Sequence, residues 1–248
     1  MGKLKEHLSK KIPDWRYNYR QLLDEKGDQV TSTVTINTAY SGMKGVKGMI
    51  CDTSSVTADA GLHVRGKHIL DLVDLKPEEI LYLLLIGELP NEEELLDLQH
   101  ELKERSVVPD YVWKVLSGMP KDSHPMAMFN TAILSMQKES KFAEAYDLVV
   151  SKGDYWESTL EDGLNIIAKL PAIGAAVYRL RFEKGDRLEP GDSVDWSENF
   201  LQMMGLDYSN DMLKMMQLYL MLHCDHEGGN VSTFSALTVN SALSDPYY

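Results

Sequence analysis

The sequence is poor in cysteine, has no long apolar run and carries no excess of basic charge. Its two cysteines, Cys51 and Cys224, are far apart and in no paired spacing, which excludes a readable disulfide framework or thiolate metal knuckle. The longest apolar stretch, residues 80–86, is much shorter than the ~20 residues that a membrane-spanning helix needs. We therefore expect a reducing compartment and a buried helix at this stretch.

Acidic residues outnumber basic ones, with 38 Asp and Glu against 25 Lys and Arg. A surface that binds nucleic acid or anionic lipid by releasing counterions is therefore not expected. The first residues carry basic charge, but they also contain Glu6 and Asp14 and lack the apolar core of a secretory signal. No intact targeting segment is visible, and we expect neither nucleic acid nor a membrane as a partner.

What the sequence does contain is a helical pattern from Pro77 onward. Pro77 followed by two glutamates is typical of a first helical turn. Asn91 with Glu94 three residues later predicts a capping box. A long apolar pattern over residues 156–182 contains Pro171, which should kink or split that helix.

Two further helices are predicted near the C-terminal end. Asp195 or Ser197 can cap the first of them, and Gly205 should end it. Ser209 can cap the second, which runs through His223. A helix that ends among polar residues would deliver those residues to one place.

The first 70 residues have a different character. Residues 1–30 are polar and weakly helical, whereas residues 31–65 are β-branched and Gly-rich and predict short strands or hairpins. We find no internal repeat and no low-complexity linker. The sequence predicts one mainly all-α domain over residues 1–248, with an arm and a small β element in 1–70 and a helical core in 71–248.

The densest group of reactive side chains is LHCDHEGGNVS, residues 222–232. His223 and His226 are three apart, so they share a face if the helix reaches that far and present two imidazoles to one molecule. A metal site is an alternative, although Asn230 stands where HExxH has its second histidine. The plainer alternative is a helix end with one hydrogen-bonded structural histidine.

A second candidate is the glycine-rich segment GMKGVKG. It places Lys44 and Lys47 on a flexible turn of an otherwise acidic chain. The alternative is an ordinary hairpin with solvated lysines.

Motifs along the whole chain resemble those of citrate synthases of the long, mitochondrial-type lineage. The resemblance is strongest at HxDHEGGN (223–230) and NSALSDPY (240–247). Other matches follow in family order: SGMKGVKG (41–48), GLHVRG (61–66), LLLIGELP (83–90), HPM (124–126), YWE (155–157), AKLPAI (168–173) and DWSENF (195–200). The resemblance implies the all-α large domain of that family.

The resemblance also implies an activity and its site residues. Citrate synthases are acyltransferases that condense acetyl-CoA with oxaloacetate and water to give citrate and CoA, feeding the tricarboxylic acid cycle. His226 matches a histidine that hydrogen-bonds oxaloacetate, and His223 and Asn230 match neighbours in that pocket. Lys44 is implied as a partner of coenzyme A phosphates, and Lys152 is a further basic candidate. No metal and no cofactor beyond the thioester substrate are implied.

Several points stay open within this resemblance. The family places its acting histidine before a glycine, beyond SALSDPY, and its aspartate later still. None of the seven histidines here precedes a glycine, so we expect the main catalytic residues and the small domain to be absent and the span to be inactive alone. A 2-methylcitrate synthase using propionyl-CoA and a non-catalytic binding module are the alternatives.

The resemblance further implies assembly and location. A homodimer is expected, with residues 124–138 and 156–182 as candidates for its two-fold interface. The implied compartment is the bacterial cytoplasm or the mitochondrial matrix.

Overall fold

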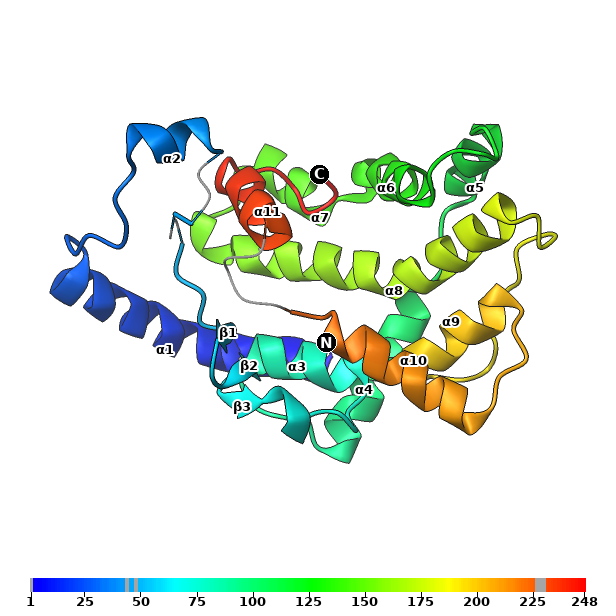
Figure 1. Cartoon of the computed structure of the whole chain (residues 1–248), viewed down its shortest axis with the longest axis horizontal. Coiled ribbons are helices and arrows are strands. Elements are labelled where there is room, and N and C mark those ends of the chain that lie inside the picture. Colours follow the sequence, from blue (N-terminus) through cyan, green and yellow to red (C-terminus); the bar gives the residue numbers. More distant parts are fainter. Residues whose placement is uncertain (1, 43–44, 47–48, 226–230) are drawn as a thin grey trace.

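The computed structural model describes residues 2–42, 45–46, 49–225 and 231–248, and it is mainly helical with one small sheet (Figure 1). This confirms the predicted all-α architecture with a small β element. The α-helices are α1 (Lys3–Lys26), α2 (Ile36–Tyr40), α3 (Pro77–Ile86), α4 (Glu92–Arg105), α5 (Asp110–Gly118), α6 (Pro125–Ser135), α7 (Lys141–Asp147), α8 (Tyr155–Arg181), α9 (Trp196–Met204), α10 (Asn210–Leu222) and α11 (Val231–Ser241). Short 3₁₀ turns are η1 (Ile69–Asp71), η2 (Gln137–Glu139) and η3 (Lys152–Asp154).

The sheet has three antiparallel strands in the order β1 (Ser54–Thr57), β2 (Gly61–Val64) and β3 (Lys67–His68). The turn between β2 and β3 places Arg65 and Gly66 in the left-handed region, at φ 47° and 78°, as a two-residue hairpin requires. The Arg65 guanidinium donates from Nε and Nη2 to the Leu84 carbonyl of α3, at 3.0 and 2.6 Å, and lies 5.8 Å from the Trp15 ring of α1.

The predicted β structure begins later than expected. Within the described residues, TSTVTIN forms no strand and leads instead into α2. The Thr35 hydroxyl accepts a hydrogen bond from the Thr38 backbone N–H at 3.1 Å and so caps this helix. A local cap therefore outweighs the β propensity of the threonines and valine.

The predicted helix boundaries from residue 77 onward are confirmed where they rest on caps. The Asn91 side chain and the Glu94 backbone N–H are 2.9 Å apart, and the reciprocal bond measures 2.8 Å. Asp195 caps α9 through the Glu198 N–H at 2.9 Å, and Gly205 ends it with φ 74°.

Helix α8 is one continuous helix that contains Pro171, so the proline does not split it. Figure 1 shows that the helix axis changes direction along its length. A proline has no N–H for the carbonyl four residues earlier. In this chain the freed Ile167 carbonyl accepts a hydrogen bond from the Trp196 indole Nε1 at 3.0 Å.

The same helix separates two hydrophobic cores. Its first half contributes Leu160, Leu164 and Ala168 to a core with α1, α3 and α4. Its second half contributes Ile173 and Val177 to a core with α5 and α6. In Figure 1, α8 accordingly runs between α5, α6 and α7 on one side and α4 and α9 on the other.

A buried carboxylate of α8 fixes the start of α7. Asp162 is fully buried and accepts three hydrogen bonds: from the Lys141 N–H at 2.6 Å, the Ser140 hydroxyl at 2.7 Å and the Phe142 N–H at 3.0 Å. These donors lie at the N-terminal end of α7, where unpaired N–H groups favour a negative charge.

Candidate functional site

Only two of the five predicted site residues can be placed. His223 and Lys152 are described, whereas His226, Asn230 and Lys44 lie outside the described residues. Helix α10 ends at Leu222 and His223 is its C-cap. The condition for His223 and His226 to share one helical face, a helix that reaches residue 226, is therefore not met.

The His223 ring is held by the last turn of α10. Its Nδ1 lies 2.6 Å from the Tyr219 carbonyl oxygen, and the two rings are 4.3 Å apart between centroids. Because a carbonyl can only accept, Nδ1 carries the proton of this bond. The other nitrogen, Nε2, is then a hydrogen-bond acceptor in the neutral ring and a donor in the imidazolium.

His223 lies at the wall of a cavity of about 310 Å³ between α3, α8 and α10, which we call the His223 cavity. Most of its lining is apolar. The lining residues are Pro77, Glu78, Leu81, Leu84, Leu102, Ile167, Leu170, Trp196, Leu220, His223 and Cys224.

Glu78 is the acidic group of this cavity and is only 2% exposed. Its Oε1 accepts hydrogen bonds from the Trp196 backbone N–H at 2.9 Å and from Gln99 Nε2 at 3.0 Å. Its Oε2 has no hydrogen-bond partner among the described residues. Burial, followed by the negative charge of Asp195, raises the pKa of the Glu78 carboxyl.

Cys224 does not offer a nucleophile to this cavity. Its Sγ donates to the Leu220 carbonyl at 3.3 Å. Although the residue as a whole is exposed, protein atoms surround its sulfur, and this burial raises the pKa of the thiol to about 12. The thiol is therefore protonated at neutral pH, and a protonated thiol is neither a good nucleophile nor a metal ligand.

Lys152 lies apart from the residues that line the His223 cavity. It is an exposed residue of η3. The Arg16 side chain of α1 donates to the carbonyl oxygen of the next residue, Gly153. The fold therefore brings a second cation to this loop, which the sequence analysis missed because 136 residues separate Arg16 from Lys152.

The metal alternative falls only partly within the structure. Among the described residues, no group of three or more His, Cys, Asp or Glu side chains is arranged to hold a metal ion. His226 and Glu227 of that alternative lie outside the described residues. Within the same described ranges, no helix is long and apolar enough to cross a bilayer.

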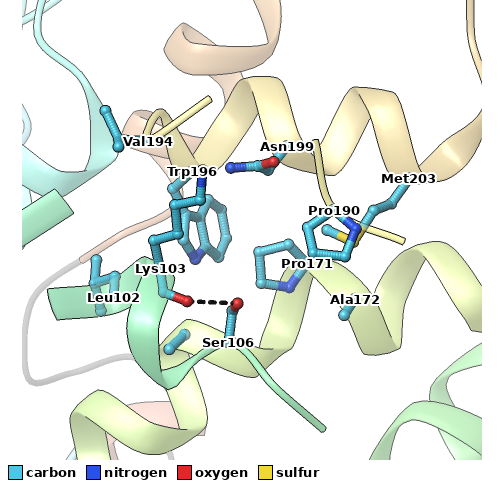
Figure 2. A pocket seen from close by; sticks show the side chains of 11 residues that line it. Leu102, Lys103, Ser106, Pro171, Ala172, Pro190, Val194, Trp196, Asn199 and Met203 are labelled. Carbon is cyan, nitrogen blue, oxygen red and sulfur yellow. Dashed lines mark hydrogen bonds between the residues drawn. The ribbon is translucent and has the colours of Figure 1, made fainter. Parts of the chain in front are cut away.

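Trp196 also lines a second, much smaller cavity (Figure 2). Figure 2 shows Pro171, Asn199 and Met203 around it, with the Ser106 hydroxyl bonded to the Lys103 carbonyl at 2.7 Å. Its volume of about 30 Å³ suits a single water molecule.

Asp195 ties α10 to the rest of the site. It is buried, and its Oδ2 accepts from Gln217 Nε2 of α10 at 2.9 Å and from Lys76 Nζ at 2.8 Å. Its Oδ1 caps α9. One carboxylate therefore positions the helix that leads into the segment 222–232.

Replacing Gln217 with leucine should loosen α10. The loss of one amide-to-carboxylate hydrogen bond corresponds to about 1–2 kcal/mol, so amide exchange over residues 210–222 should speed up by about tenfold. Hydrogen–deuterium exchange read by mass spectrometry measures this. The matched control is Gln137→Leu, which removes an equal 2.9 Å bond to Asp245 elsewhere in the chain; unchanged protection of α10 in the Gln217 variant would contradict this prediction.

The chain is similar in sequence to known proteins. The family model "Citrate synthase, C-terminal domain" matches residues 42–248. The chain is 37% identical to a mitochondrial citrate synthase of Citrus maxima and 39% identical to a peroxisomal citrate synthase of Saccharomyces cerevisiae. Each match covers 98% of this chain and 54% or 55% of the relative. The chain thus spans about half the length of the curated relatives it matches.

Solved structures agree with these sequence matches. A citrate synthase from Pyrobaculum aerophilum superposes with a TM-score of 0.77 at 29% identity, over 88% of this chain and 56% of that one. A second, from Thermoplasma acidophilum in a ternary complex with carboxymethyl coenzyme A and oxaloacetate, gives 0.73 at 25% identity, over 88% and 54%. The family model, the sequence identities and the shared fold together show that the chain belongs to the citrate synthase family.

Proposed function

We propose that the whole protein condenses acetyl-CoA with oxaloacetate and water to give citrate and CoA, and that this chain supplies part of its substrate pocket. One observation carries the proposal: citrate synthases match 98% of the chain at 35–40% identity. The Thermoplasma acidophilum relative, with its coenzyme A analogue and oxaloacetate, supports the choice of substrates.

We assign oxaloacetate binding to His223, His226 and Asn230. The two carboxylates and the keto group of oxaloacetate need hydrogen-bond donors. With Nδ1 engaged by the Tyr219 carbonyl, His223 donates from Nε2 only as an imidazolium.

We assign the phosphates of coenzyme A to Lys44 and Lys152. Each lysine offers a point charge without the bidentate fork of arginine. The Arg16 contact beside Lys152 adds positive charge to that loop. The proposal includes no cofactor and no metal, and it places the protein in bacterial cytoplasm or the mitochondrial matrix.

We also propose that the protein is a homodimer through residues 124–138 and 156–182. On α6, Met126 and Leu134 are about half exposed and leave apolar surface for a partner. On α8, the small residue Gly174 already serves packing within the chain, because a Cβ there would lie 3.3 Å from Phe200. The α6 surface is therefore the stronger half of this interface.

Thiol release from acetyl-CoA in the presence of oxaloacetate tests the proposed reaction. We expect none from the 248-residue chain alone, because no histidine in it precedes a glycine, and we expect release from a polypeptide that includes the family's downstream catalytic segment. A chromogenic thiol reagent measures it, with oxaloacetate omitted as the control.

Four outcomes would change the proposal. Release by the 248-residue chain would overturn its inactivity. Faster release from propionyl-CoA than from acetyl-CoA would favour a 2-methylcitrate synthase. No release by the longer polypeptide would leave a non-catalytic binding module, and stoichiometric zinc by elemental analysis would favour the metal alternative.

A further inference from the structure

The His223 cavity contains a buried carboxyl oxygen with no partner. Glu78 is almost fully enclosed, and its Oε1 is already occupied by the Trp196 N–H and Gln99. Its Oε2 is unpartnered among the described residues. Leaving a buried polar atom unbonded destabilises a fold, so this oxygen marks a place where a bound group would be favourable.

The other polar groups of the cavity narrow the chemistry of that group. His223 Nδ1 is already engaged by the Tyr219 carbonyl. The Cys224 thiol and both N–H groups of Trp196 already donate to protein acceptors. The remaining walls are aliphatic: Pro77, Leu81, Leu84, Leu102, Ile167, Leu170 and Leu220.

We propose that the His223 cavity binds a cationic nitrogen, an ammonium or guanidinium group carried on an apolar stem, with Glu78 as its counterion. The head donates to Glu78 Oε2 and the stem packs against the leucines. This inference goes beyond the proposed citrate synthase reaction: it assigns the cation to Glu78 and leaves Nε2 of His223 to oxaloacetate.

Charge around the cavity favours a cation over an anion. The second carboxylate near Glu78 is Asp195, and Lys76 is paired with it at 2.8 Å. Glu78 and Asp195 therefore share one ammonium, and a carboxylate ligand would meet the one negative charge that Lys76 leaves uncompensated. A cation would remove the penalty that burial places on ionised Glu78.

The proposal has a consequence for pH. Burial raises the pKa of Glu78, so a cation displaces its proton, and affinity rises as pH increases through that raised pKa. The groups that face Glu78 are Asp195, Lys76, Cys224 and His223. The variant below isolates the contribution of Glu78 from that of these groups.

The size of the cavity suits a short ligand. A volume of about 310 Å³ lies at the lower end of small-molecule pockets. The same cationic chemistry could come from a free amine or from a lysine or arginine side chain of a polypeptide. Both sources bring one charged head and an aliphatic stem.

Hexylammonium, hexanol and hexanoate test the proposal on the 248-residue chain. Binding is followed by NMR through the Trp196 indole N–H and the His223 ring. Hexylammonium should bind at least about tenfold more tightly than hexanol, since a charged hydrogen bond is stronger than a neutral one, and hexanoate should bind most weakly. Equal or tighter binding of hexanol or hexanoate would overturn the proposal.

The variant Glu78→Gln removes the charge but keeps an acceptor for the Trp196 N–H. Hexylammonium should lose its advantage of about tenfold and its rise in affinity with pH, whereas hexanol should bind as before. The matched control is Glu79→Gln, a neighbouring carboxylate that does not line the cavity. If Glu78→Gln fails to fold, the wild-type series and its pH slope decide the question.

A further pair of ligands separates the two sources. A short apolar peptide with one lysine is compared with the same peptide carrying norleucine. Binding of the lysine peptide without binding of hexylammonium assigns the cavity to a polypeptide side chain, and the reverse assigns it to a free amine. Binding of neither cation overturns the proposal.

Discussion

Replacing Asp162 with alanine is expected to lower the free energy of unfolding by about 4 kcal/mol, at the upper end of single-substitution effects. The carboxylate is fully buried and accepts from Ser140, Lys141 and Phe142. Alanine would leave all three donors without this partner. It would also remove the negative charge from the N-terminal end of α7.

Urea unfolding followed by circular dichroism measures this loss. Asp162→Asn keeps one acceptor oxygen and should lose only about half as much free energy. Asp147→Ala is the matched control, because Asp147 is an exposed residue of α7, the helix whose N-terminal end Asp162 contacts. This substitution should change stability by less than about 0.5 kcal/mol. Equal effects at positions 162 and 147 would show that the three hydrogen bonds contribute nothing net.

The second large effect is expected at the bend of α8. Trp196→Phe removes the indole N–H that serves the Ile167 carbonyl, and we expect a loss of about 2 kcal/mol. Pro171→Ala restores a backbone N–H that can bond to this same carbonyl. The loss caused by Trp196→Phe should therefore shrink by about 1 kcal/mol in the Pro171→Ala background.

A double-mutant cycle in urea measures that coupling. Trp15→Phe is the control for loss of an indole, since Trp15 lies at the surface on α1. It should show no coupling to Pro171→Ala. Additive effects of Trp196→Phe and Pro171→Ala would mean that the indole bond does not replace the one the proline lacks.

Local side-chain chemistry made much of the fold predictable. Asn91, Asp195 and Gly205 act on backbone groups within a few residues of themselves, so sequence alone identifies the helix ends they form. The continuity of α8 is different. The carbonyl that Pro171 leaves free is bonded by Trp196, a residue 25 positions further along the chain that reaches it only through tertiary packing.

The candidate site divides in the same way. His223 stands out in the sequence because reactive residues cluster around it, and the structure places it beside a cavity. Glu78 was predicted only as a favourable first-turn glutamate. Its spacing from Leu81 and Tyr82 puts it on one face with apolar residues, and that pattern was the available signal for its burial.

The left-handed turn at Arg65 has a consequence for the small sheet. The Arg65 guanidinium belongs to the hairpin and contacts both helix α3 and helix α1. A slip of the strand pairing by one residue would expose Val64, which is buried at 2%, and would also draw the guanidinium away from the Leu84 carbonyl. Exposure of an apolar side chain and loss of hydrogen bonds would both destabilise the shifted pairing, so the Arg65 side chain helps to fix the register of the strands.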